Sequence, residues 1–164
     1  MSVTEFIFPM VDCGVIDPLP EQPGLVLRRV GAGTADALLQ PAMTPEQCRT
    51  AIRNGRELVA GLPGNAILLG EMGIGNTSPA SLLLARLAGL PIEQVVGPGA
   101  GLDAAGRQHK IQVLGQVLER HAQATEPLDA LAALGGFEIA TLAGAVLQAA
   151  LENRVIVVDG FITS

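Results

Sequence analysis

The chain has 164 residues and a formal net charge of −6; 49% of its residues are apolar, yet it contains no Trp, no Tyr and only four Phe. This size suits a single domain, residues 1–164, with a core of small aliphatic side chains. An acidic chain with so few aromatic residues lacks the basic surface and the stacking platforms of nucleic-acid-binding proteins. We therefore expect no nucleic-acid partner, and the high apolar fraction also excludes a disordered chain.

The N-terminal segment shows no export or membrane signal, because it has no positively charged region and Pro9 breaks its short apolar run. No apolar run in the sequence reaches the length of a bilayer span. The two cysteines, Cys13 and Cys48, are isolated, and the chain has only two His, so neither a zinc site nor a disulfide is predicted. We expect reduced cysteines, no metal, no cofactor, no membrane contact and a cytoplasmic location.

The first third of the chain predicts one strand and one helix. The sequence IFPMVDCG predicts a strand near residues 8–12, which a Pro-rich loop follows. The ambiguous segment 25–40 is expected to form one or two helical stretches. A helix is predicted over residues 45–60, because Thr44 is a good N-cap, a proline occupies the first turn and Gln47 completes a capping box.

Apolar strands and amphipathic helices alternate through the rest of the chain. Strands are predicted near 66–69 and 155–158, and helices near 79–88, 104–121 and 137–152, with a further helix in EPLDALAALGG, residues 126–136; a short element at 91–97 is either a helical turn or a strand. Continuously apolar strands are typical of a parallel sheet that helices cover on both sides. The predicted fold class is therefore α/β, a Rossmann-like parallel sheet flanked by helices on both faces.

Each of the three predicted strands ends in a carboxylate and a glycine, and the carboxylates are Asp12, Glu71 and Asp159. In open parallel sheets the ligand crevice lies outside the carboxyl ends of the strands. We expect the three carboxylates to converge on one cleft. The alternative is that each of them caps the element that follows it.

The loop after the strand near 66–69 concentrates small and polar residues: Gly70, Glu71, Gly73, Gly75, Asn76, Thr77 and Ser78. Glycines allow a ligand to approach the backbone, and free amides at the start of a helix favour an anion. Either Thr77 or Ser78 is expected to cap that helix. The loop lacks the third glycine of a dinucleotide fingerprint and the Gly-Lys pair of a Walker A loop, so neither of those cofactor sites is expected.

A second glycine-rich loop, VVGPGAGLD, contains Gly97, Gly99 and Gly101, and Lys110 follows it within a predicted helix. A lysine one or two turns into that helix can reach back and act as a point charge for a phosphate group. The alternative is a solvated lysine on the helix surface.

Six segments together resemble one known family: GAGTADALLQPAMT, LGEMGIGNTSPASLL, VVGPGAGLD, GRQHKIQVL, LDALAALGGFEIATLAGAVL and VIVVDGFITS. They are similar, in order and spacing, to nicotinate-nucleotide–dimethylbenzimidazole phosphoribosyltransferase, and the similarity runs from about Val11 to Ser164. The resemblance implies transfer of phosphoribose from nicotinate mononucleotide to 5,6-dimethylbenzimidazole. The implied products are nicotinate and α-ribazole 5′-phosphate, the nucleotide of the lower ligand of cobalamin. The resemblance also implies that the protein forms a homodimer.

The resemblance assigns roles to residues of this sequence. Glu71 and the loop Gly73–Ser78 match the nucleotide-binding signature, and Lys110 matches a lysine that holds the nucleotide phosphate. The segment that contains Gly99 and Gly101 matches a glycine-rich stretch beside the same substrate. The pair Asp159-Gly160 matches a strand-end motif at the site.

Two features depart from the family pattern. The second glycine loop carries Pro98 and Ala100 where the family often has Arg and Thr, so contacts of those side chains are not expected here. Family members are also longer at both ends, and their catalytic base is a glutamate in a Gly-Glu-Gly loop that does not occur in this sequence. We therefore expect a chain that resembles the central portion of the enzyme, truncated and slow or inactive alone.

The missing base leaves two functions open. In the first, the chain is a phosphoribosyltransferase or a piece of one, with Glu71 in an auxiliary role that orients the ribose or the cationic nicotinate. In the second, it is a nucleotide-binding domain without turnover.

Overall fold

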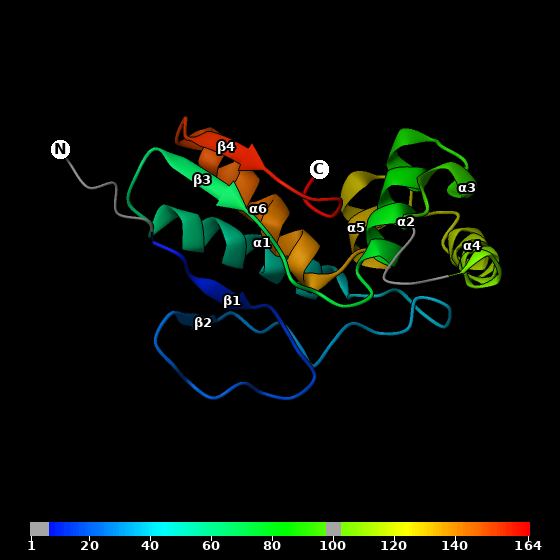
Figure 1. Cartoon of the computed structure of the whole chain (residues 1–164), viewed down its shortest axis with the longest axis horizontal. Coiled ribbons are helices and arrows are strands. Elements are labelled where there is room, and N and C mark those ends of the chain that lie inside the picture. Colours follow the sequence, from blue (N-terminus) through cyan, green and yellow to red (C-terminus); the bar gives the residue numbers. More distant parts are fainter. Residues whose placement is uncertain (1–6, 98–102) are drawn as a thin grey trace.

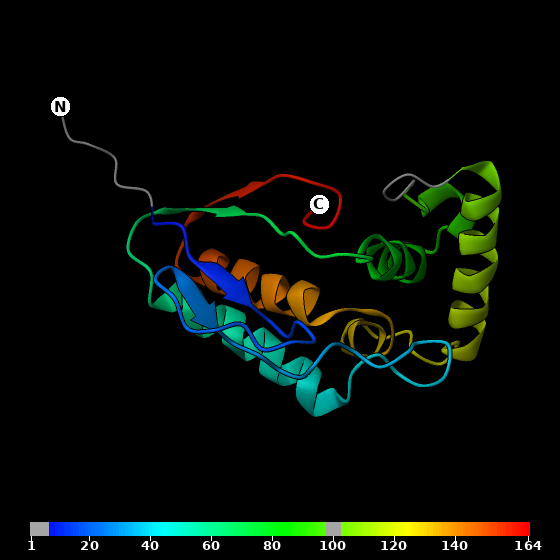
Figure 2. The same ribbon diagram turned by 60° about the horizontal axis from the view of Figure 1, so that its bottom comes forward.

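The computed structural model describes residues 7–97 and 103–164. Its elements, in chain order, are β1 (Met10–Asp12), β2 (Leu25–Leu27), α1 (Pro45–Ala60), β3 (Ala66–Leu69), α2 (Thr77–Ala88), α3 (Ile92–Val95), α4 (Ala104–Arg120), α5 (Pro127–Leu134), α6 (Phe137–Leu151) and β4 (Val155–Val158). The strands gather around α1 and α6 at one end of the molecule, and α2 to α5 form a helical cluster at the other end (Figures 1 and 2).

The predicted helices are present, and their ends follow the predicted signals closely. At the start of α1, the hydroxyl of Thr44 accepts a hydrogen bond from the amide of Gln47 (3.1 Å), and the side chain of Gln47 accepts one from the amide of Thr44 (2.9 Å). Helix α2 begins at Thr77, two residues earlier than predicted, because Pro79 lies within its first turn, where a missing N–H costs nothing. The short element predicted at 91–97 is a helical turn, α3.

Helices α1 and α6 pack with their backbones in direct contact. A Cβ atom on Gly55 of α1 would overlap the carbonyl group of Thr141, and a Cβ atom on Gly144 of α6 would overlap the carbonyl group of Ile52. Glycine at both positions therefore lets the two helices approach more closely than side chains would allow. Around this contact, the pair also packs against the β3–β4 sheet and against Cys13 and Val30, which follow β1 and β2 in the chain.

The strands form two separate parallel pairs. Strand β3 pairs with β4, with Ala66 opposite Val155, and β1 pairs with β2, with Met10 opposite Leu25. The α/β class is confirmed, but the expectation of one sheet shared by all three predicted strands is wrong for the described residues.

The partner of β1 is a strand that the sequence analysis expected to be helical. The segment after Leu27 contains Gly33 with a φ of +77°, a left-handed conformation that ends any helix, and Gly24 with a φ of +83° turns the chain just before β2. Between these two glycines, the extended run that pairs with β1 is the three-residue strand Leu25–Leu27. Residues 25–40 are therefore a short strand and a connecting loop.

Helices cover one face of the β3–β4 pair. On the inner face, Ile67 packs against Val59 of α1 and Ala149 of α6. On the outer face, Leu68 is 67% exposed and Val155 is 61% exposed, and within residues 7–97 and 103–164 no helix covers them. The prediction of helices on both faces is therefore not met within these residues, because the described chain supplies helices to one side.

The helical cluster at the other end positions the predicted site. Apolar side chains of α2, α3, α4 and α5 form one core cluster, which includes Leu82, Val95, Ile111, Leu114 and Leu134. This packing fixes α2 and α4 relative to each other. The segment that leads from α3 into the second glycine loop therefore starts beside the first turn of α2.

Candidate functional site

Glu71 shapes the first glycine loop from within. Its carboxylate accepts a hydrogen bond from the amide of Gly73 (2.8 Å) and another from the side-chain amide of Asn76. A Cβ atom at position 73 would overlap the side-chain amide of Asn76, so a larger residue would displace the group that bonds Glu71. The carboxylate thus holds the loop in a compact turn at the carboxyl end of β3.

At the start of α2, the amide of Ser78 donates to the carbonyl oxygen of Gly75 (3.1 Å), and Pro79 has no N–H. Asn76 occupies the N-cap position, and no side chain among the described residues caps the helix. The expectation that Thr77 or Ser78 would be the N-cap is wrong, because the helix begins at Thr77 and both hydroxyls belong to its first turn. The positive end of the α2 dipole, next to exposed Gly75, still favours an anion.

Lys110 reaches back from α4 to this point. Its ammonium group donates a hydrogen bond to the hydroxyl of Thr77 (2.8 Å) and lies 3.5 Å from the carbonyl oxygen of Gly97. The side chain is half-buried, and burial lowers the pKa of Lys110. The lysine is therefore directed at the start of α2 rather than solvated on the helix surface, and its phosphate-binding role remains a prediction.

The end of β4 approaches the same place. Gly160 has a φ of +103°, which turns the chain directly after the exposed Asp159. The turn brings the ring of Phe161 to Gly97, where two ring carbons lie 3.3 Å from the position that a Cβ atom would take. The hydroxyl of Thr163 donates to the carbonyl oxygen of Asp159 (2.6 Å) and stabilises this turn. The structure thus brings Asp159-Gly160, Gly97 and Lys110 into one region.

Two of the predicted site residues cannot be placed in this region. Gly99 and Gly101 lie outside the described residues, so their predicted contact with a substrate is untested. The described chain before this gap ends at Gly97, which Lys110 contacts, and the chain after the gap resumes at Asp103, the N-cap of the helix that carries Lys110.

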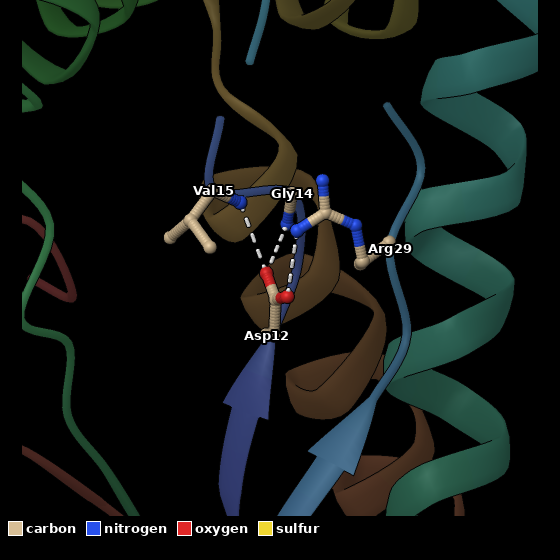
Figure 3. A network of polar contacts seen from close by, with 4 residues as sticks. All are labelled: Asp12, Gly14, Val15 and Arg29. Carbon is tan, nitrogen blue, oxygen red and sulfur yellow. Dashed lines mark hydrogen bonds and ion pairs between the residues drawn. The ribbon is translucent and has the colours of Figure 1, made fainter. Parts of the chain in front are cut away.

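Asp12 does not join this region, and the expectation that three carboxylates converge is wrong for it. Its side chain is buried and forms an ion pair with Arg29 (2.9 Å), and it accepts hydrogen bonds from the amides of Gly14 (2.8 Å) and Val15 (3.0 Å), as Figure 3 shows. Burial raises the pKa of Asp12, but these amides and Arg29 together outweigh burial and lower it. Both carboxylate oxygens are engaged at the end of β1 and the side chain is inaccessible, so Asp12 has a structural role.

Glu138 is a carboxylate near the site that the sequence analysis missed. It lies in the first turn of α6, directly after the Gly135-Gly136 break. Burial raises the pKa of Glu138, and the negative charge of Glu71 raises it further. No local sequence signal pairs the two residues, because they lie far apart in the chain and only the packing of α6 brings them together.

Two cavities of the described chain lie away from this region: one of about 350 Å³ between α1 and α6, lined by Arg53 and Gln148, and one of about 810 Å³ lined by Gln47, His121 and Asp129. Within residues 7–97 and 103–164, no group of His, Cys, Asp and Glu side chains is arranged to hold a metal ion. No helix in that part of the chain is long and apolar enough to cross a membrane.

The chain is similar to known proteins over nearly its whole length. A sequence model of the phosphoribosyltransferase family matches residues 4–164. A nicotinate-nucleotide–dimethylbenzimidazole phosphoribosyltransferase of Variovorax paradoxus is 68% identical over 155 residues, which are 94% of this chain and 44% of the relative. The enzyme of the same name from Cupriavidus taiwanensis is 52% identical, again over 94% of this chain and 46% of the relative.

A solved structure agrees with these similarities. The crystal structure of CobT from Thermus thermophilus matches with a TM-score of 0.88 and 39% identity, over 94% of this chain and 47% of that one. The chain thus spans less than half the length of the curated relatives it matches. The chain belongs to the phosphoribosyltransferase family, in which its curated relatives are named nicotinate-nucleotide–dimethylbenzimidazole phosphoribosyltransferases.

Proposed function

We propose that this chain carries the nucleotide-binding half of a phosphoribosyltransferase site and binds nicotinate mononucleotide through its phosphate. The observation that supports this most directly is the Lys110 ammonium group, held 2.8 Å from the Thr77 hydroxyl at an uncapped helix N-terminus. A cation and a hydroxyl at the positive end of a helix are groups that bind a phosphate in proteins. The names of the curated relatives supply the nucleotide and the benzimidazole base.

The reaction proposed for the site is transfer of phosphoribose to 5,6-dimethylbenzimidazole. A ring nitrogen of the acceptor attacks C1′ of the ribose, while the bond between C1′ and the nicotinate nitrogen breaks. The electron pair of that bond neutralises the pyridinium, and nicotinate leaves. The other ring nitrogen of the acceptor loses its proton to a base, and the products are α-ribazole 5′-phosphate and nicotinate. Holding both substrates in line lowers the barrier by restricting their motion.

Glu71 is proposed to orient the nucleotide rather than to act as the base. Its carboxylate already accepts hydrogen bonds from Gly73 and Asn76, so it is held within its own loop. Its negative charge, with that of Glu138 nearby, favours the cationic nicotinate ring of the bound nucleotide. A general base contributes about 10²–10⁴-fold to such a reaction, and the sequence contains no Gly-Glu-Gly tripeptide to supply the base of the family.

A second candidate function is nucleotide binding without transfer. It is favoured by the state of Glu71, the carboxylate of the first glycine loop, which is hydrogen-bonded to Gly73 and Asn76 within that loop rather than free to take a proton. In this case nicotinate mononucleotide binds through the same groups, and no product forms.

We further propose a homodimer and a cytoplasmic location. The uncovered apolar face of the β3–β4 pair, with Leu68 at 67% and Val155 at 61% exposure, supports self-association. Size-exclusion chromatography with light scattering measures the mass in solution, and a strictly monomeric chain would contradict the dimer.

Two experiments on the 164-residue chain test the proposal. Calorimetric titration with nicotinate mononucleotide is compared with nicotinate riboside, which lacks the phosphate; we expect the nucleotide to bind at least about tenfold more tightly. Equal affinities, or no binding of either, would overturn the phosphate site. A chromatographic assay for α-ribazole 5′-phosphate with both substrates then decides between the two functions, with a full-length relative as the positive control.

A further inference from the structure

Ser81 is completely buried in α2, one turn after the residue that Lys110 contacts. Its hydroxyl lies 2.7 Å from the carbonyl oxygen of Thr77, 3.0 Å from that of Val95 and 3.4 Å from the amide nitrogen of Gly97. A hydroxyl has one proton and two acceptor positions. Ser81 therefore donates to one of the two carbonyls and accepts from the amide of Gly97.

Two of the residues that Ser81 contacts, Thr77 and Gly97, are also contacted by Lys110, through different atoms. The Lys110 ammonium group contacts the hydroxyl of Thr77 and the carbonyl oxygen of Gly97. The half-buried lysine and the buried serine thus connect the same two segments, the first turn of α2 and the chain that leads into the second glycine loop. The position of the ammonium group depends on how these two segments are held together.

The residue type at position 81 fits such a connection. Alanine is the better residue for a helix interior, and a buried hydroxyl without a partner costs free energy. A serine that is fully buried in a helix is favourable only when its hydroxyl forms hydrogen bonds, as it does here across two elements. Removing the hydroxyl would leave the amide of Gly97 without this partner.

We propose that Ser81 is a positioning residue of the phosphate site: its buried hydroxyl fastens the Val95–Gly97 segment to the first turn of α2 and thereby holds the Lys110 ammonium group beside Thr77. The proposal rests on the proposed function for its ligand, but the positioning itself concerns the free protein. The two can therefore be tested separately.

The test compares Ser81→Ala with Thr141→Val, a matched control in α6. Thr141 is also buried and donates a hydrogen bond to the carbonyl oxygen four residues earlier, at 2.7 Å, but it lies in the α1–α6 contact and away from Lys110. Ala has high helix propensity, so Ser81→Ala is expected to fold. Thermal unfolding of both variants verifies this before the other measurements.

Two readouts need no ligand. By NMR, the amide of Gly97 should exchange with solvent about tenfold faster in Ser81→Ala, because one hydrogen bond of this size is lost. The pKa of Lys110 can be followed by the ε-carbon signal during a pH titration. In Ser81→Ala this pKa should rise toward the ordinary lysine value, because a loosened Val95–Gly97 segment admits water to the ammonium group. Thr141→Val should leave both unchanged.

A third readout uses nicotinate mononucleotide as the probe. Ser81→Ala should lower its affinity about tenfold, and in a Lys110→Ala background the same substitution should add little, because the group it positions is gone. Full additivity of the two losses would contradict positioning through Lys110.

The outcomes separate the two claims. If the wild-type chain binds no nucleotide, the proposed function fails, while Gly97 exchange and the Lys110 titration still decide the role of Ser81. If those two signals are unchanged in Ser81→Ala, the positioning role is overturned. It is also overturned if exchange rises equally at amides throughout the chain, because Ser81 would then be a general packing residue.

Discussion

The α1–α6 contact and the candidate site are held together in opposite ways. At the contact, Gly55 and Gly144 let two backbones touch, and the position is fixed by the absence of side chains. At the site, the polar side chains of Lys110 and Ser81 connect the first turn of α2 to Gly97. A few hydrogen bonds hold these two segments together. The first arrangement tolerates almost no added atom, whereas the second tolerates change in shape but not the loss of a polar group.

The same contrast applies to the carboxylates at the strand ends. Asp12, after β1, is buried and has all its partners within the chain. Glu71, after β3, is bonded within its loop yet lies among exposed residues such as Met72 and Ile74. Equivalent sequence patterns thus produce a structural carboxylate in one place and a candidate binding group in the other.

The largest effect is expected from filling the helix contact. Gly144→Ala should lower the free energy of unfolding by at least about 3 kcal/mol, because its Cβ atom overlaps the backbone of Ile52 and neither helix can shift without disturbing the core. Chemical denaturation measures this loss.

A matched control is Gly115→Ala in α4, where no atom lies within 4 Å of the added Cβ. There the substitution should stabilise the protein by about 0.5–1 kcal/mol, because alanine is favoured over glycine within a helix. Equal effects of the two substitutions would contradict the backbone contact between α1 and α6.

A smaller loss of stability is expected at Asp12. Asp12→Asn removes the charge that pairs with Arg29 and should lower the free energy of unfolding by about 2 kcal/mol near pH 7. This is below the loss for a fully buried pair because Arg29 remains partly hydrated. The control Asp17→Asn lies in the exposed loop after β1 and should change stability by less than about 0.5 kcal/mol.

The pH dependence of this loss has a definite sign. The pKa of Asp12 is lowered by folding, so its stabilising contribution is present above the ordinary aspartate value of about 3.9 and is lost as the pH falls through the folded-state value. The difference between wild type and Asp12→Asn should therefore shrink in acid. A difference that grows with falling pH would contradict the ion pair.

The smallest effect is expected at Glu138, and its sign is opposite. Burial, with a contribution from Glu71, raises the pKa of Glu138, so ionisation of this group destabilises the folded state as the pH rises above about 4.3. Glu138→Gln should be equal to wild type in stability near pH 4 and progressively more stable than wild type as the pH rises to 8.

The control for this substitution is Glu21→Gln, in the exposed loop between β1 and β2. Denaturation curves of both variants at several pH values measure the difference. A stability gain for Glu138→Gln that does not change with pH, or a loss at pH 8, would contradict the account of its environment.

Local signals in the sequence predicted the helices well. The capping box at Thr44 and the buried stripe of α1 both depend on residues a few positions apart, so the sequence contains all the required information. Strand β2 was missed because a strand of three residues has too little pattern to distinguish it from a helical turn, and its pairing with β1 depends on the intervening loop.

Long-range contacts determined what the sequence analysis could not predict. The pattern of a carboxylate after a strand does not reveal whether an arginine such as Arg29 lies within reach, so Asp12 was assigned to the cleft. The proximity of Glu138 to Glu71 depends on the packing of α6. By contrast, Lys110 was expected to reach back toward the glycine loops, and the structure places it there, although its role as a phosphate ligand is still a prediction.

The central claim is that Lys110 and the start of α2 form a phosphate site, and one titration tests it most directly. Binding of nicotinate mononucleotide is measured at fixed ionic strength for wild type, Lys110→Ala and Arg107→Ala. Arg107 is an exposed cation one turn earlier on α4 that donates to the carbonyl oxygen of Glu93 (2.9 Å), so it controls for general charge. A charge-assisted contact is worth about 1.5–3 kcal/mol, which predicts about tenfold to a hundredfold weaker binding for Lys110→Ala and little change for Arg107→Ala. Equal affinities of wild type and Lys110→Ala, or equal losses in the two variants, would contradict the site.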